Sequence, residues 1–232
     1  MSIDLPLGIP RPAGPESLLS ALLSERFTQA DEARTAKTAS VCGPPIVSAA
    51  SLLGQDGLEL GKIVVDLDLD PTKLRGAPQA AYEAVRYQLD CPADDLGDAI
   101  ALRVPSPLAV YPTTGDPGLA DAARALVDGG KIPGLGRGYS ASAIADFLSV
   151  LAHADTGFVA RADNPSEVLS ILAGTVASLR GDDVRRALES PNAASLASLI
   201  PEAASAVREV LIGIEVAAPV DVGAQLNALG LT

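Results

Sequence analysis

The stretch KIPGLGRGYSASAIADFLSVLAHADTGFVARAD, Lys131 to Asp163, decides the fold. It starts with a short apolar segment, passes through a glycine-rich turn, and enters a helix whose apolar side chains follow i, i+3, i+4, i+7 spacing. Those side chains are Ile144, Phe147, Leu148 and Leu151. The apolar run from Gly157 to Ala160 then indicates a buried strand. A strand, a helix and a second strand in this order predict a right-handed parallel β-α-β unit.

Similar junctions recur along the chain. Asp70-Pro71, Asp116-Pro117 and Asn164-Pro165 each follow an expected strand and precede an expected helix. Asp or Asn suits the N-cap, and Pro suits the first helical position. Glu167 lies three residues after Asn164, which is the spacing of a capping box. The repeated junction favours a series of β/α units.

About eight strands are expected, mostly separated by helical segments. They cover 41–50, 62–70, 82–89, 100–104, 108–113, 131–133, 157–160 and 210–216. A first helix is expected at 17–27, because Leu18, Leu19, Leu22 and Leu23 lie on one side. The fold class is therefore α/β, a (β/α)8 TIM-barrel-like single domain over 1–232, with an extended Pro/Gly-rich segment at 1–15. An open doubly wound parallel sheet is the alternative, although no glycine fingerprint follows the first clear strand.

Composition narrows the classes of partner. The 232 residues are 48% hydrophobic and 3% aromatic, and the net charge is −12. Such acidity argues against nucleic acid and against anionic membrane surfaces, which both attract cationic proteins. Cys42 and Cys91 are far apart and lack metal-site spacing, so buried thiols are expected. Without an apolar signal segment or a membrane-length helix, a cytoplasmic location is expected.

Several short motifs in residues 40–232 carry a resemblance to an uncharacterised bacterial family of (β/α)8-barrel-like proteins. They are Lys131-Ile132-Pro133-Gly134, Phe158-Val159-Ala160-Arg161, and the ending Pro219-Val220 with Leu226 to Leu231. The resemblance implies a barrel and no activity. The family has a His pair after its Phe-x-Ala strand, whereas this chain has Asp163-Asn164-Pro165 there, so no role of that pair is transferred.

Candidate catalytic residues follow from the barrel, because ligands bind at the carboxyl ends of its strands. We expect Lys131, Arg161 and Asp68 to be catalytic. Lys131 could form a Schiff base if burial lowered its pKa, and an ordinary ion-paired lysine is the alternative. Other polar residues expected near strand ends are Asp70, Arg103, Tyr111 and Glu215.

The glycine-rich turn is a candidate anion site made of Gly134, Gly136, Arg137, Gly138 and Ser140. Glycines let backbone N–H groups approach an anion, and the following helix N-terminus and Arg137 add positive charge. The turn matches neither the dinucleotide-binding nor the P-loop motif, so no cofactor is expected. A flexible turn without a ligand is the alternative.

Asp66, Asp68 and Asp70 lie on one face of their expected strand and could hold Mg²⁺. Helix capping and neutralisation by nearby cations are the alternative, and no metal is expected. His153 is the only histidine, and its position at a helix end suits a dipole partner better than a general base.

Two classes of function remain open from the sequence. The first is a lyase- or isomerase-type enzyme for a small anionic or carbonyl-containing metabolite. The second is a non-catalytic binding or assembly subunit, and this reading leaves room for a homo-oligomer or a protein partner. The scarcity of His, Cys, Trp and Tyr favours the second, and the polar residues expected at strand ends favour the first.

Overall fold

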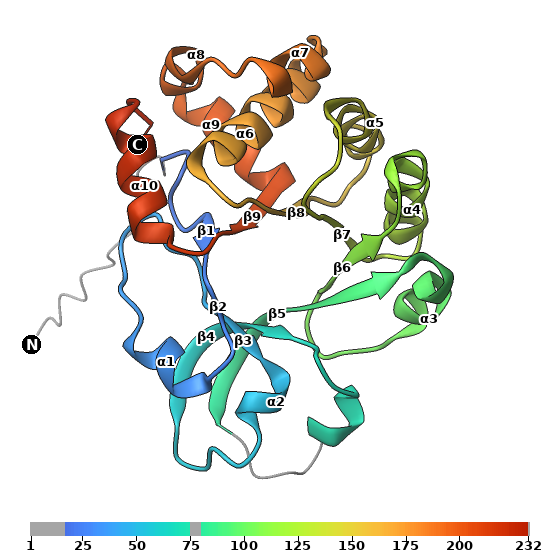
Figure 1. The fold of residues 1–232 in the computed structure, drawn as a ribbon, viewed down its shortest axis with the longest axis vertical. Helices are drawn as coiled ribbons and strands as arrows, with labels where there is room; N and C mark the ends of the chain where they lie inside the picture. Colours follow the sequence, from blue (N-terminus) through green and yellow to red (C-terminus); the bar gives the residue numbers. More distant parts are fainter. Residues whose placement is uncertain (1–16, 75–79, 232) are drawn as a thin grey trace, which may run out of the picture.

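The computed structural model describes residues 17–74 and 80–231, so the expected extended segment at 1–15 lies outside the described residues. All neighbouring strands pair in parallel, in the order β1-β9-β8-β7-β6-β5-β4-β3-β2. The first two strands, β1 (Leu23–Ser24) and β2 (Arg26–Phe27), are separated by Glu25 alone. The two ends of the row therefore adjoin, and the strands form a nearly closed α/β barrel (Figure 1).

The remaining strands are β3 (Ile46–Ser48), β4 (Glu59–Asp66), β5 (Ala81–Pro92), β6 (Leu108–Thr113), β7 (Ile132–Leu135), β8 (Phe158–Arg161) and β9 (Leu211–Glu215). The α-helices are α1 (Ala30–Thr35), α2 (Ala49–Leu52), α3 (Leu96–Ala101), α4 (Asp116–Asp128), α5 (Ala141–Leu151), α6 (Pro165–Arg180), α7 (Val184–Glu189), α8 (Ala193–Ala197), α9 (Pro201–Val210) and α10 (Pro219–Ala228). Two 3-10 helices, η1 (Pro71–Leu74) and η2 (Ala93–Asp95), follow β4 and β5.

The barrel and its parallel strands confirm the expected fold class, with two errors in the elements. The segment 17–27 is not a helix: Ala21 adopts a positive φ of 52°, and the chain then extends as β1 and β2. Backbone hydrogen bonds to β9 and β3 satisfy this extended segment, which a local apolar pattern does not reveal. The expected strand at 100–104 is the end of α3 and a loop, so β1 and β2 take its place in the ring.

The core has an outer and an inner part. Most buried apolar side chains lie between the strands and the helices, as Phe147 and Phe158 do, whose rings meet edge to face with centroids 5.5 Å apart. Inside the barrel a small apolar cluster joins Ala109, Tyr111 and Val159, with Ile132 packed against it. Because successive side chains of a strand alternate between the two faces, residues two positions apart share a face, so Arg161, two positions after Val159, points to the same interior.

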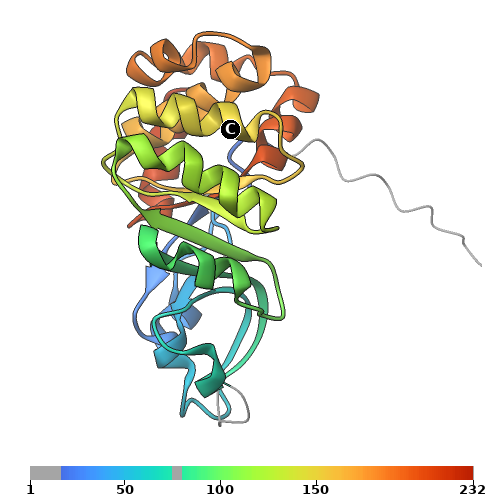
Figure 2. The same ribbon diagram turned by 90° about the vertical axis from the view of Figure 1, so that its right-hand side faces the viewer.

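Helices cover the barrel unevenly. Figures 1 and 2 show α4 to α10 gathered around one half of the molecule, whereas the half built from β2 to β5 carries the short helices α1 to α3. The connection between β8 and β9 contains four helices, α6 to α9, in place of the single helix of a simple β/α unit. None of the helices in 17–74 and 80–231 combines the length and hydropathy needed to cross a membrane.

Candidate functional site

The carboxyl ends of the strands hold a cluster of charged and polar side chains inside the barrel, which we call the mouth cluster. Its members are Arg26, Asp66, Gln88, Asp90, Tyr111, Arg161 and Glu215. They come from β2, β4, β5, β6, β8 and β9, so almost the whole ring contributes. In a parallel barrel this is the end at which ligands bind.

Glu215 is the centre of the mouth cluster. Its carboxylate accepts two hydrogen bonds from Arg26, each 3.0 Å long, and one of 3.1 Å from Nε of Arg161. Desolvation tends to raise the pKa of Glu215, but the hydrogen bonds and charges of both arginines outweigh it and lower the pKa below its ordinary value of 4.5. Glu215 therefore stays ionised in a side-chain environment that is only 7% exposed.

Arg161 is held on three sides. Its guanidinium pairs with Asp90 and Glu215, and it stacks over the ring of Tyr111 with 3.8 Å between Cζ and the ring centroid. The ring of Tyr111 in turn lies against β7, where a Cβ on Gly134 would stand 2.5 Å from Cδ1 of the ring. The absence of a side chain at Gly134 is thus what lets Tyr111 support Arg161.

Asp66 differs from Glu215 although both bind Arg26. Desolvation is the largest effect on Asp66 and raises its pKa above the ordinary 3.8, against the opposing charge of Arg26 and a hydrogen bond from Gln88. Gln88 joins the two acids, since its Nε2 lies 3.4 Å from Oδ1 of Asp66 and 3.3 Å from Oε2 of Glu215. The cluster therefore contains two buried carboxyl groups whose pKa values are displaced in opposite directions.

A cavity of about 270 Å³ opens beside the mouth cluster, between the turn after β7 and the helices α5 and α6. Arg161 lines it together with Gly136, Arg137 and Gly138, and apolar side chains such as Ile144 and Ile171 form other walls. The side chain of Arg137 is 39% exposed and pairs with Asp163, while its Nη2 lies 3.8 Å from Oε1 of Glu215. Two arginine side chains thus line a space that is slightly smaller than the usual small-molecule site of about 300–1,000 Å³.

No family model, no curated protein and no solved structure matches this chain in the three comparisons. The resemblance to a bacterial barrel-like family consequently stays a prediction, and the geometry of the site carries the functional argument alone.

The three residues expected to be catalytic do not come together. Lys131 precedes β7 and so lies at the amino end of the barrel, where its Nζ donates a 2.6 Å hydrogen bond to the carbonyl of Leu102. Arg161 ends β8 at the opposite rim. Asp68 lies beyond the end of β4, accepts hydrogen bonds from the Ser48 hydroxyl and from the Ala50 amide, and thereby anchors the start of α2.

The expected anion site is divided in a similar way. Gly136, Arg137 and Gly138 line the cavity beside Arg161, and Gly138 has a φ of +83° that favours glycine. Gly134 lies within β7 against Tyr111. Ser140 caps α5 by accepting a 3.2 Å hydrogen bond from the Ala143 amide.

Sequence reasoning did not select Arg26, Gln88 and Asp90. Arg26 was hidden because its segment resembled a helix. Gln88 and Asp90 carried a usable signal, because together with Arg86 they form the polar face of an alternating strand. A polar face on a strand that is covered by helices on its outer side points into the barrel.

The acidic row at β4 does not converge on a cation. Asp66 pairs with Arg26, Asp68 anchors α2, and Asp70 accepts 2.8 Å hydrogen bonds from the amide and hydroxyl of Thr72. Within the described ranges, no group of three or more His, Cys, Asp or Glu side chains could hold a metal ion. Cys42 and Cys91 are free thiols.

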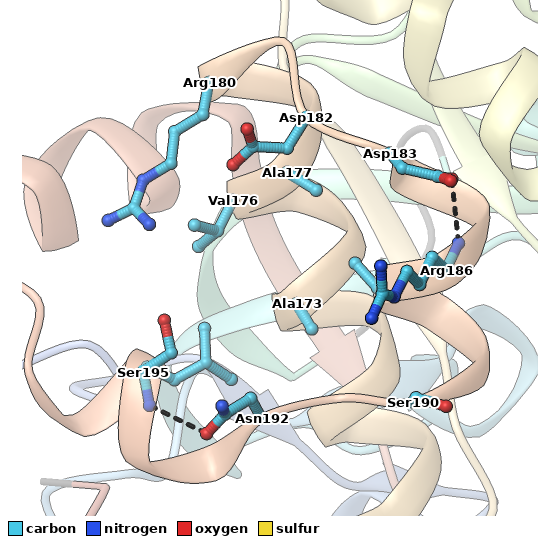
Figure 3. A pocket seen from close by; sticks show the side chains of 12 residues that line it. Ala173, Val176, Ala177, Arg180, Asp182, Asp183, Arg186, Ser190, Asn192 and Ser195 are labelled. Carbon is cyan, nitrogen blue, oxygen red and sulfur yellow. Dashed lines mark hydrogen bonds between the residues drawn. The ribbon is translucent and has the colours of Figure 1, made fainter.

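A second and larger cavity, of about 420 Å³, lies away from the barrel mouth, among α6, α7 and α8. Its floor consists of small apolar residues of α6, including Ala173 and Ala177 (Figure 3). Arg180 and Arg186 lie on its rim, and Figure 3 shows them on different sides of the hollow.

Proposed function

We propose that the protein is a barrel enzyme that binds a small anionic or carbonyl-containing metabolite at the mouth cluster and moves a proton on it, as lyases and isomerases do. The observation that carries this proposal is the convergence of Arg161, Arg137 and the Gly136–Gly138 turn on one cavity. Guanidinium groups match carboxylates and phosphates through paired hydrogen bonds. Arg137 retains the freedom to donate, because its ion pairs with other described residues engage Nε with Asp163 and, at 3.8 Å, Nη2 with Glu215.

The two carboxyl groups supply the proton-transfer chemistry in this proposal. Groups with pKa values pushed apart are suited to opposite roles. Asp66, with its raised pKa, exchanges the proton, and Glu215, with its lowered pKa, stays ionised and holds Arg26 and Arg161 in place. Gln88 donates to both carboxyl groups through Nε2, and its buried Oε1 has no hydrogen-bond donor among the described residues.

A non-catalytic binding or assembly subunit is the second candidate. The pairing inside the mouth cluster favours it, because Arg26 and Arg161 already have carboxylate partners. Buried ion pairs of this kind can have a structural role in a barrel interior without taking part in catalysis.

Ligand binding is the first test. Purified protein is screened by thermal shift against phosphate, sugar phosphates and small keto and hydroxy acids, because a ligand at a hundred times its Kd adds about 2.7 kcal/mol of stability. The increase should be absent in Arg137→Ala and present in Arg124→Ala, whose arginine lies on the outer face of α4 and pairs with Asp121. A shift that survives in Arg137→Ala would contradict the assigned site.

Proton exchange separates the two candidates. Each binding acid is incubated with the protein in D₂O, and the loss of its C–H signals is followed by proton NMR. The enzyme proposal expects exchange that is lost in Asp66→Asn while the thermal shift persists. Binding without any exchange, by wild-type protein and variant alike, would favour the non-catalytic subunit.

A further inference from the structure

The cavity among α6, α7 and α8 has features of a second ligand site, separate from the mouth cluster. It is built by the additional helices of the β8–β9 connection, which lie outside the ring of strands. At about 420 Å³ it falls within the range of small-molecule sites. The helices α7 and α8 enclose this space together with α6.

The two arginines on its rim are available for a ligand. In residues 17–74 and 80–231, no carboxylate forms an ion pair with Arg180 or Arg186. Asp183 is on the same rim, but its Oδ1 accepts a 3.0 Å hydrogen bond from the backbone amide of Arg186. Arg180 and Arg186 thus place two positive charges beside one hollow in a chain whose net charge is −12.

The floor and the second aspartate restrict the chemistry of the ligand. Ala173, Val176 and Ala177 are buried and present apolar surface to the hollow. Asp182 also lines it and would repel a compact, highly charged anion such as phosphate. A single carboxylate can bind a guanidinium through two parallel hydrogen bonds, and an attached apolar group can cover the alanine floor.

We propose that this cavity binds an organic monocarboxylate, with its apolar body placed over Ala173 and Ala177. The exposed side chains of Arg180 and Arg186, which lie on different sides of the hollow, turn toward the carboxylate when it binds. The cavity is present whether or not the barrel mouth is catalytic. We expect a ligand to need both a negative charge and an apolar body in order to bind.

Titrations followed by amide NMR test the site directly. The probes are benzoate, benzyl alcohol as the neutral analogue, and inorganic phosphate as the charge without an apolar body. Benzoate should shift the amide signals of Ala173, Ala177 and Leu196 in a saturable manner, and the other two probes should bind at least about tenfold more weakly. Equal binding of benzyl alcohol would overturn the role of the arginines.

Variants complete the test. Arg180→Ala and Arg186→Ala should each weaken benzoate binding about tenfold or more at these amides. Arg185→Ala is the matched control, because it removes an exposed arginine from the same helix that does not line the cavity. Arg137→Ala should leave the titration unchanged, which separates this site from the barrel mouth. Absence of saturable shifts at millimolar benzoate, or shifts that persist when both rim arginines are replaced, would refute the proposal.

Discussion

Glu215 links the charged side chains inside the barrel. It is shared by Arg26 and Arg161, so its removal leaves two largely buried guanidinium groups short of a partner. Breaking a buried ion pair by removing one member costs about 3–5 kcal/mol. Glu215→Gln should lose stability of this size in urea unfolding at pH 7, whereas Glu189→Gln, at an exposed position, should stay close to the wild type. Equal stability of the two variants would show that the network is not a stabilising unit.

The pH dependence of stability follows from the same carboxylate. The pKa of Glu215 is lowered on folding, so its contribution is complete above the ordinary value of 4.5 and is lost as the pH falls through the lowered value of the folded state. Wild-type stability should therefore decline between pH 4.5 and more acidic conditions, and the decline should be shallower in Glu215→Gln. The contribution of Asp66 to stability changes with pH in the opposite direction. Because its pKa is raised on folding, this contribution is lost as the pH rises above 3.8.

Glycine at position 134 lets the ring of Tyr111 pack closely against the backbone of β7, and any side chain there would clash with the ring. Its missing Cβ would lie within 3 Å of several atoms of the Tyr111 ring, whereas a Cβ on Gly136 would meet its nearest neighbour, Cε2 of Tyr139, at 3.4 Å. Overpacking of this kind costs about 1–3 kcal/mol. Gly134→Ala should lower the melting temperature and weaken ligand binding at the mouth, and Gly136→Ala should retain stability. A fully stable Gly134→Ala would mean that Tyr111 can move without consequence.

At the scale of the element, two junctions that look alike in sequence behave differently. Asn164 caps α6 by accepting a 3.0 Å hydrogen bond from the Glu167 amide, and the carboxylate of Glu167 accepts a hydrogen bond from the amide of Asp163. Asp116, by contrast, lies inside α4, whose N-cap is Gly115 without a side-chain bond. Asn164→Ala should cost about 1 kcal/mol in chemical unfolding. Asp116→Ala should cost clearly less, and the reverse order would contradict the assigned caps.

Elements with a local apolar pattern can be predicted from the sequence, whereas elements held by long-range pairing cannot. The helix α5 was predicted in its observed place, because its apolar stripe from Ile144 to Leu151 is local in the sequence. The segment 17–27 was not, because its leucines satisfy a helical pattern while its backbone bonds join it to β9 and β3, which are distant in sequence. Arg26 was missed with it. A site assembled across the barrel depends on such long-range pairing, so only members on expected strands were named in advance. They are Arg161, Tyr111 and Glu215 as strand-end residues, and Asp66 in the acidic row.

At the scale of the whole molecule, closure of the barrel rests on a very short segment. The amide of Ile46 donates to the carbonyl of Glu25 at 2.8 Å, and the amides of Ile214 and Val216 donate to Leu22 and Ser24 at 2.8 and 2.9 Å. If the ring opens only on global unfolding, these amides should exchange with solvent as slowly as that of Val110 in β6. Hydrogen exchange measured by NMR decides this. Much faster exchange at all three positions would mean that the barrel opens locally at β1 and β2.

The two cavities share a wall. Leu188 of α7 lines the cavity beside Arg161, while Arg186 and Ala187 of the same helix line the second cavity. Gly174 lets α6 and α7 pack closely, since a Cβ there would come within 2.6 Å of Cδ2 of Leu188. A movement of α7 that widens one cavity therefore alters the other. If occupation of the outer site changes the affinity of the barrel mouth by some factor, thermodynamic reciprocity requires the mouth ligand to change the outer affinity by the same factor.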